Sequence, residues 1–154
     1  MQRIPYLGFN GNCAEAMRFY ASVLDGRLEV LMSGAESLLA AQTTRAFADG
    51  ILHARLALKG GGYLYGGDAP AQMPFQGIHG GSVTLNFSTI AEARNVFDQL
   101  AVGGKVTRAF TASFWARGFG MLVDRFGVSW IVNGELPIQP IAGALGTSAT
   151  GSIS

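Results

Sequence analysis

The sequence predicts an α+β fold made of two βαβββ modules, and an internal repeat is the main reason. The segments that begin at Ala14 and Ala91 both read Ala-Glu-Ala and lie 77 positions apart. Gly26 and Gly103 repeat at the same distance, each after apolar residues at helical spacing. A strand pattern precedes each helical run and three follow it, which indicates a duplicated module. Since neither module covers its own sheet, we expect the modules to pair into a cleft-forming mixed β-sheet with the helices outside.

The first module is predicted to span residues 4–67. Its helix begins at Asn12, because Asn12 and Glu15 have the spacing of an N-cap and the residue that completes a capping box. Gly26 occupies the position that commonly ends a helix. Three glycines at 60–62 separate two strand patterns and predict a hairpin turn. The predicted strands are 4–9, 27–32, 51–58 and 63–66, with a short helix within 36–48.

The second module is predicted to span residues 81–133, after a linker at 68–80 that is rich in proline and glycine. Thr89 and Glu92 match a capping box, so the second helix begins there and ends before Gly103. A tight turn is predicted at 124–127, with Asp124 fixing the turn and Gly127 free to adopt a positive φ. The predicted strands are 82–87, 105–108, 119–123 and 128–132.

The composition predicts a soluble cytoplasmic protein that binds neither nucleic acid nor a membrane. Charged residues make up 14% of the 154 residues and the net charge is +1, with no basic block. No apolar run approaches the roughly 18 residues that a membrane helix needs. The single cysteine, Cys13, excludes an internal disulfide and is expected to be a small buried residue. The tail at 134–154 has low complexity and could lay an apolar arm on a neighbouring subunit.

Several segments spread over residues 4–133 resemble one known superfamily. They are Tyr6 to Ala16 (YLGFNGNCAEA), Phe19-Tyr20, Ile51 to Ala54 (ILHA), Gly103 to Val106 (GGKV), Phe114-Trp115 and Phe119 to Trp130 (FGMLVDRFGVSW). The sequence is similar to the vicinal oxygen chelate superfamily, which includes glyoxalase I, bleomycin resistance proteins and extradiol dioxygenases, and specifically to its PhnB-like branch. The resemblance implies the glyoxalase/bleomycin-resistance/dioxygenase fold and a homodimer with clefts near or across the subunit interface.

The resemblance also raises the question of a metal, because catalytic members hold a divalent ion with His and Glu side chains. Three of the ligand positions fall near Pro5, Ser82 and Ile131, and the fourth falls in the strand at 63–65. None of these residues is a usual ligand for Zn, Ni, Fe or Mn, so we expect no cofactor at this site. A replacement site would need His53, His79 and a carboxylate such as Asp68 to converge.

The candidate site residues are one histidine, one arginine and a set of aromatic residues. His53 lies mid-strand and could act as a general base or bind a substrate, or it is an ordinary hydrogen-bonded histidine on a half-buried strand. Trp115 and Arg117 could stack on a planar ligand and pair with an acidic one, or they are a packed aromatic beside a solvated arginine. The other candidates line a cavity or belong to the core: Tyr6, Phe9, Tyr65 and Phe119.

We therefore expect the protein to bind a small organic molecule in an aromatic cleft without the usual metal site. The alternative is a metal-dependent lyase, isomerase or dioxygenase with a non-standard site around His53. A third possibility is a structural dimer whose cleft is filled by its own side chains. Members of the PhnB-like branch are sometimes labelled methyltransferases, but the glycines at 60–62 lie between two strands and do not form a strand-loop-helix fingerprint for S-adenosylmethionine.

Overall fold

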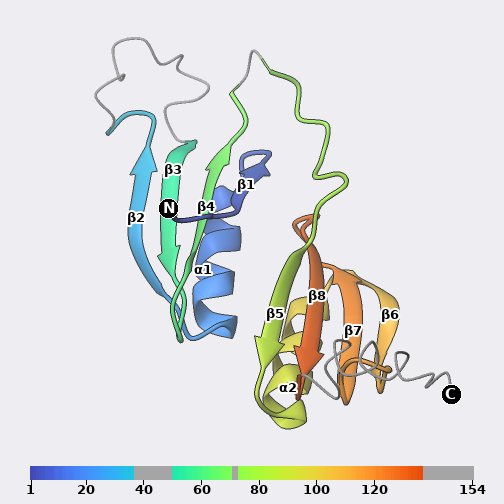
Figure 1. Ribbon diagram of the computed structural model, residues 1–154. Helices are drawn as coiled ribbons and strands as arrows, with labels where there is room; N and C mark the ends of the chain where they lie inside the picture. The colour runs from blue at the N-terminus through green and yellow to red at the C-terminus, as the bar shows by residue number, and fades with distance from the viewer. Residues whose placement is uncertain (37–49, 71–72, 137–154) are drawn as a thin grey trace, which may run out of the picture.

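The computed structural model describes residues 1–36, 50–70 and 73–136 (Figure 1). Within these residues, two helices and eight strands follow one another in the order that the sequence predicts, so the two βαβββ modules are confirmed. The predicted helix within 36–48 and most of the C-terminal tail fall outside the described residues. The elements are β1 (Tyr6–Phe9), α1 (Cys13–Val23), β2 (Arg27–Ser33), β3 (Ile51–Ala57), β4 (Tyr63–Asp68), β5 (Val83–Phe87), α2 (Ile90–Ala101), β6 (Lys105–Thr111), β7 (Gly118–Val123) and β8 (Ser129–Gly134).

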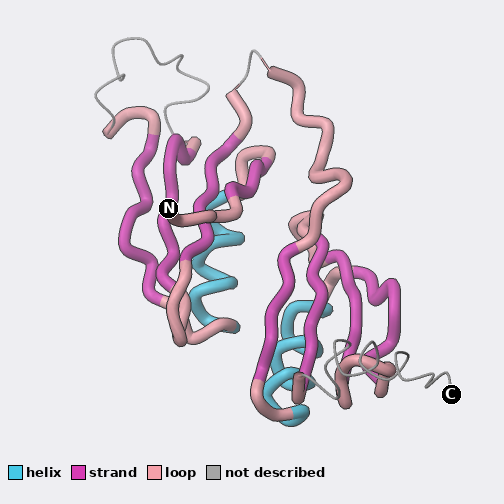
Figure 2. The backbone as a smooth tube through the Cα atoms, in the orientation of Figure 1, coloured by secondary structure: helices cyan, strands magenta, loops and turns pink. Residues whose placement is uncertain are grey.

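The strands form two separate four-stranded sheets with the same topology. Sheet A has the order β1-β4-β3-β2 and sheet B the order β5-β8-β7-β6. In each sheet the first pair, β1 with β4 or β5 with β8, is parallel, and the remaining pairs are antiparallel. Figure 2 shows the two sheets in magenta, each with one helix in cyan. Helix α1 covers one face of sheet A, and α2 covers one face of sheet B. The opposite face of each sheet is not covered by its helix, and we call it the open face.

The two modules meet through α1 and the β7–β8 hairpin. A single core of buried residues runs through both modules, from Leu7 and Phe9 in β1 to Trp130 and Val132 in β8. Within the described part of the chain no strand of sheet A pairs with a strand of sheet B. In one copy of the chain the two mixed sheets are therefore joined through packed side chains.

A buried carboxylate stands at the centre of this contact. Asp124 accepts hydrogen bonds at Oδ1 from the backbone N–H groups of Phe126 and Val128, at 2.9 and 3.0 Å, which confirms its role in the hairpin turn. Its Oδ2 accepts two more, from the Tyr20 hydroxyl of α1 at 2.5 Å and from Trp130 Nε1 at 2.8 Å. Burial and the neighbouring Asp124 raise the pKa of Tyr20 far above its usual value. Sequence analysis predicted the turn but gave no sign of the link to α1.

Both helices begin where the sequence predicts, but only one of the two predicted N-cap residues makes a capping hydrogen bond with its side chain. Thr89 caps α2 as predicted, since its Oγ1 accepts from Glu92 N at 3.2 Å. Asn12 is the N-cap of α1, but its side chain makes no capping hydrogen bond. Asp68, at the end of β4, binds the backbone at the start of the helix instead. Its Oδ1 accepts hydrogen bonds from Gly11 N and Cys13 N, and its Oδ2 accepts one from Ile51 N.

The two repeated glycines, Gly26 and Gly103, have different structural roles. Gly103 follows α2 with a φ of +73°, as expected of a residue that ends a helix. At the end of α1 the positive φ, +50°, belongs to Asp25. Gly26 is required for space, because a Cβ there would lie 2.8 Å from Ala57 O. The predicted turns at 60–62 and at Gly127 are confirmed, with φ values of +85°, +103°, +88° and +88°.

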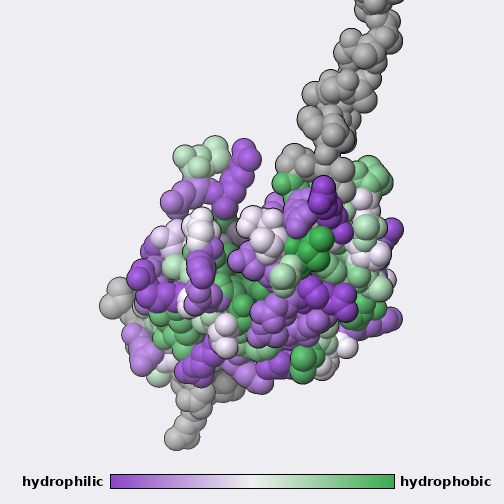
Figure 3. Space-filling model, turned by 90° about the horizontal axis from the view of Figure 1, so that it is seen from below, coloured by the Kyte–Doolittle hydropathy of each residue, from purple (hydrophilic) through white to green (hydrophobic). Residues whose placement is uncertain are grey.

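Seen from below, apolar residues gather between more polar flanks (Figure 3). No helix in the described ranges is both long enough and apolar enough to cross a membrane.

Candidate functional site

The first candidate site lies on the open face of sheet A, where strand alternation brings three predicted residues together. Leu7, Ala54 and Leu64 are buried on the side of α1. The residues next to them, Tyr6, His53 and Tyr65, therefore point to the other face. The pairing register sets Tyr6 opposite Tyr65, and Tyr65 opposite Arg55, so the row crosses three neighbouring strands.

Four rings on this face form what we call the aromatic row: Tyr6, His53, Tyr65 and Tyr63. The His53 ring lies 6.2 Å from that of Tyr6 at an interplanar angle of 23°, and 5.0 Å from that of Tyr65 at 87°. Tyr63 extends the row, 6.3 Å from Tyr65. Tyr6 is 57% exposed and is the most accessible ring of the four. A ligand that reaches the row would meet Tyr6 first and His53 beside it.

A charged group ends the row on the side of β2. The Arg55 guanidinium lies 4.4 Å above the Tyr63 ring, and its Nε is 3.1 Å from Glu29 Oε2. The other oxygen of Glu29 is 2.5 Å from Arg27. This hydrogen bond with Arg27 is the main cause that lowers the pKa of Glu29, and a hydrogen bond with Tyr63 raises the pKa of Arg55. Two guanidinium groups thus share one carboxylate.

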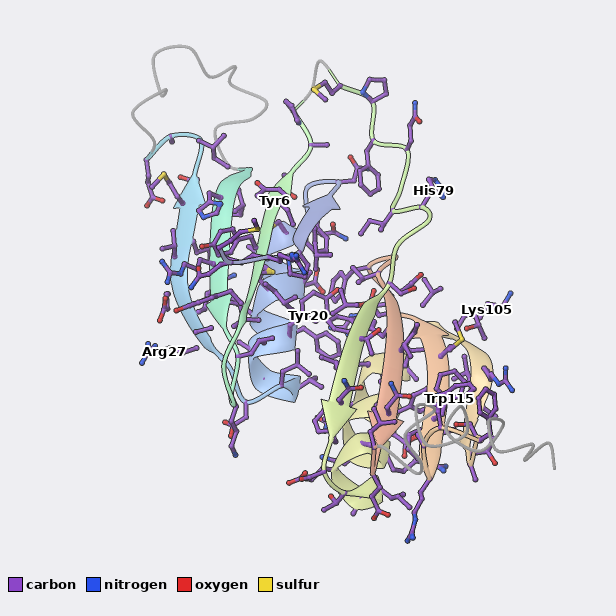
Figure 4. All side chains as sticks on the ribbon, in the orientation of Figure 1. Tyr6, Tyr20, Arg27, His79, Lys105 and Trp115 are labelled. Carbon is purple, nitrogen blue, oxygen red and sulfur yellow. The ribbon has the colours of Figure 1, made fainter. Side chains whose placement is uncertain are left out.

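A pocket of about 610 Å³ adjoins the row at Tyr6. It lies between the ends of β1 and β4 and the segment that connects β4 to the second module; Figure 4 labels Tyr6 and His79 on its two sides. Gly8 and Gly67, paired across the two strands, leave room for it. A Cβ at Gly8 would have nothing within 4 Å, whereas one at Gly67 would lie 2.6 Å from the Tyr6 hydroxyl. Its further lining includes Leu52, Pro70, Met73, Phe75, Ile78 and His79.

The other predicted residues gather on sheet B. Trp115 packs edge-on against Phe119, with ring centroids 4.7 Å apart, and its Nε1 donates to Asn133 Oδ1 at 3.3 Å. Arg117 is directed to Glu135 instead, at 3.6 Å. The structure therefore brings Trp115 and Phe119 together, but on a different sheet from His53.

Phe9 and Cys13 belong to the core. Both side chains have no exposed surface, and Phe9 packs beside Tyr20, with ring centroids 6.5 Å apart. Burial, with the nearby Asp68, raises the pKa of the Cys13 thiol to about 12. Phe9 does not reach the open face of sheet A, and Cys13 is the small buried residue that the sequence predicted.

The metal site of the superfamily does not fit these residues. Ile131 lies in β8, and Pro5 and Ser82 lie just before β1 and β5. In the described ranges, no group of three or more His, Cys, Asp or Glu side chains could hold a metal ion. Asp68 uses both carboxylate oxygens on backbone N–H groups, and His79 bonds to the carbonyl of Gln76.

Sequence reasoning missed two parts of this site. The alternation of the strand at 51–58 places Arg55 on the face of His53, but nothing in the sequence shows that β2 would bring Glu29 beside it. The pocket beside Gly8 depends on the parallel pairing of β1 with β4, which links residues almost 60 positions apart. A local pattern carries no signal of such a pairing.

Comparison with known proteins agrees with the fold and with the resemblance. The chain is 32% identical to Protein YjdN of Escherichia coli strain K12 over 138 residues, which cover 84% of this chain and 92% of YjdN. The crystal structure of PA1353 from Pseudomonas aeruginosa matches with a TM-score of 0.81 and 41% identity, covering 88% of this chain and 98% of PA1353.

More distant solved structures share the fold. The PhnB protein from Bacillus cereus matches with a TM-score of 0.72 and 24% identity, covering 87% of this chain and 99% of that protein. A glyoxylase/bleomycin resistance protein/dioxygenase domain from Frankia sp. EAN1pec matches with a TM-score of 0.59 and 15% identity, over 89% of this chain and 97% of that domain. Residues 1–133 match the model of the family described as 3-demethylubiquinone-9 3-methyltransferase. The chain therefore belongs to the family described as 3-demethylubiquinone-9 3-methyltransferase, and it shares its fold with the PhnB protein and with the glyoxylase/bleomycin resistance protein/dioxygenase domain.

Proposed function

We propose that the protein binds a small organic molecule in the pocket beside Tyr6, against the aromatic row of sheet A. The observation that supports this most is that the row and the pocket meet at one residue. Tyr6 stacks on His53 and also lines the pocket. A ring held in the pocket would contact Tyr6, and a longer molecule would continue over His53 and Tyr65.

The size and lining of the pocket support the same conclusion. Small-molecule sites usually enclose about 300–1,000 Å³ and are mostly apolar with a few polar groups. Here about 610 Å³ is lined by apolar side chains such as Met73, Phe75 and Ile78, together with Tyr6 and His79. The alternative, a metal-dependent enzyme centred on His53, is favoured by no observation on the described residues.

Filling the pocket from Gly8 tests the proposal. Because a Cβ there meets nothing within 4 Å, Gly8→Leu directs a side chain into the pocket from an unobstructed Cβ position. The matched control is Gly81→Leu, which is equally open and lies outside this pocket. Phenol, indole, benzamide and 2-naphthol would be titrated into ¹⁵N-labelled protein, and the amide signals of Gly8 and Gly67 followed.

We expect at least one of these compounds to shift both glycine signals in the unmodified protein and in Gly81→Leu. Gly8→Leu should weaken its binding about tenfold or more, since the ring would have to displace a packed leucine. Shifts confined to sheet B, or binding that Gly8→Leu leaves unchanged, would refute the assignment of the site.

We also infer that two copies of the chain associate. Large apolar side chains remain exposed in one copy, among them Met32 (38%), Val106 (45%) and Phe114 (83%). Exposed aromatic residues of this kind are enriched at protein interfaces. Light scattering after gel filtration should give the mass of a dimer, and Phe114→Ser should raise the dissociation constant. A monomer at about 100 µM, far above a typical dissociation constant, would overturn this inference.

A further inference from the structure

The aromatic row ends in an excess of positive charge. Arg27 and Arg55 both approach Glu29, so the three groups together carry a net charge of +1. The row itself, three tyrosines and one histidine, contributes no carboxylate. At this end of the row an anionic group therefore meets a net attraction, and a cationic group meets repulsion.

Arg55 also has hydrogen-bond capacity to spare. Its Nε is shielded from solvent and faces Glu29 Oε2 at 3.1 Å without making a hydrogen bond, so the donors that a ligand would meet are the outer N–H groups of the guanidinium. The guanidinium carries five N–H donors in a planar fork that suits a carboxylate. About a third of the Arg55 side chain is exposed, so a ligand can reach it from the open face.

The row connects this arginine to the pocket. Tyr6, Tyr65 and Arg55 lie opposite one another on β1, β4 and β3. Neighbouring strands are about 4.8 Å apart, so Arg55 lies about 10 Å from Tyr6 along the row. A molecule with its ring beside Tyr6 and an acid group a few atoms away could engage both.

A cation held by several rings is the competing possibility, since tyrosines commonly bind cations in this way. The Tyr63 ring is already occupied by Arg55 at 4.4 Å, and the net charge of the face is unfavourable to a second cation. We infer that the site takes an aromatic carboxylate, with its ring against Tyr6 and His53 and its acid group on Arg55. This inference rests on the proposed function of the same site.

Three probes of one shape separate the possibilities: 3-phenylpropionate, 3-phenylpropan-1-ol and 3-phenylpropylamine. Their affinities would be measured from the Gly8 and Gly67 amide shifts in the unmodified protein, Arg55→Gln, Arg55→Lys and Glu29→Gln. Arg94→Gln is the control, because Arg94 lies on α2 and is exposed in an ion pair with Asp98.

We expect the acid to bind about tenfold or more tightly than the alcohol, as a charge-assisted hydrogen bond provides, and the amine to bind most weakly. Arg55→Gln should remove the difference between acid and alcohol while the alcohol still binds. Arg55→Lys should keep part of the affinity difference between acid and alcohol. Glu29→Gln should increase this difference, because it removes a carboxylate that competes for Arg55. Arg94→Gln should behave as the unmodified protein.

Equal binding of acid and alcohol would overturn this inference and leave the proposed binding site standing. Tightest binding of the amine would favour the cation instead and also overturn it. If none of the three probes shifted Gly8 and Gly67, the binding site and the inference would both be refuted for aromatic compounds of this size. Should Arg55→Gln fail to fold, Arg55→Lys and Glu29→Gln still test the charge preference in opposite directions.

Discussion

Replacing Asp124 by asparagine should weaken the whole fold, because this carboxylate holds both modules. Its Oδ1 can keep the two backbone hydrogen bonds of the turn after the substitution. Its Oδ2 becomes an NH₂ group, which cannot accept from Trp130 Nε1 at 2.8 Å or from the Tyr20 hydroxyl at 2.5 Å. The Tyr20 hydroxyl can turn and accept a hydrogen bond instead, but the indole N–H has no such choice.

The expected loss follows from these two contacts. Trp130 is fully buried, so leaving its N–H without an acceptor costs about 1–3 kcal/mol. Exchanging the charge-assisted bond to Tyr20 for a neutral one costs about another 1 kcal/mol. We therefore expect the free energy of unfolding to fall by about 3 kcal/mol, which lowers the melting temperature of a chain of this size by about 6–12 °C.

Urea unfolding, followed by far-UV circular dichroism, measures this loss, and a thermal melt provides a second value. Asp98→Asn is the matched control, because Asp98 is 58% exposed in its pair with Arg94. This substitution should change the free energy of unfolding by less than about 0.5 kcal/mol. A loss of less than about 1 kcal/mol for Asp124→Asn, no larger than a typical single hydrogen bond, would refute the view that this carboxylate joins the modules.

Three further outcomes can be measured by the same unfolding assay. Thr89→Ala should cost about 1 kcal/mol, since its side chain caps α2, whereas Asn12→Ala should cost less than about 0.5 kcal/mol because no such bond exists; equal losses would contradict this. Gly26→Ala should cost about 1–3 kcal/mol, because the new Cβ would meet Ala57 O at 2.8 Å, and an unchanged midpoint would show that the backbone gives way. The pKa of Cys13 is about 12 in the folded state, above that of an unfolded thiol. Its contribution to the free energy of unfolding is therefore complete below pH about 8.5 and is lost as the pH rises toward 12. Cys13→Ala should flatten that decline, and an unaltered slope would assign it to other groups.

The fold was readable from the sequence because its signals are local. Apolar residues at helical spacing, a threonine cap at Thr89 and glycines at 60–62 and 127 each mark an element or a turn within a few residues. The repeat then gave the topology, since two identical orders of elements predict two identical sheets. These parts of the structure are confirmed.

The candidate site was readable only in part, because its other half depends on contacts between distant segments. Alternation put His53 and Arg55 on one face, but the neighbours of each come from β1, β2 and β4. The same limit explains Asp68, which sequence analysis placed in a linker. Its three hydrogen bonds reach residues 17 to 57 positions away, so its role emerges only once the chain has folded.

The repeat is not symmetric where the modules touch. Tyr20 of α1 corresponds to Phe97 of α2 in the 77-residue repeat, so only the first helix offers a hydroxyl to the other module. Apolar contacts alone tolerate sliding, whereas a hydroxyl and an indole that share one carboxylate oxygen accept a single arrangement. The contact is therefore one-sided: the tyrosine of the first module meets the carboxylate of the second, and the matching helix position, Phe97, offers no hydroxyl in return. The two modules share one topology, yet the residues with which they contact each other are different.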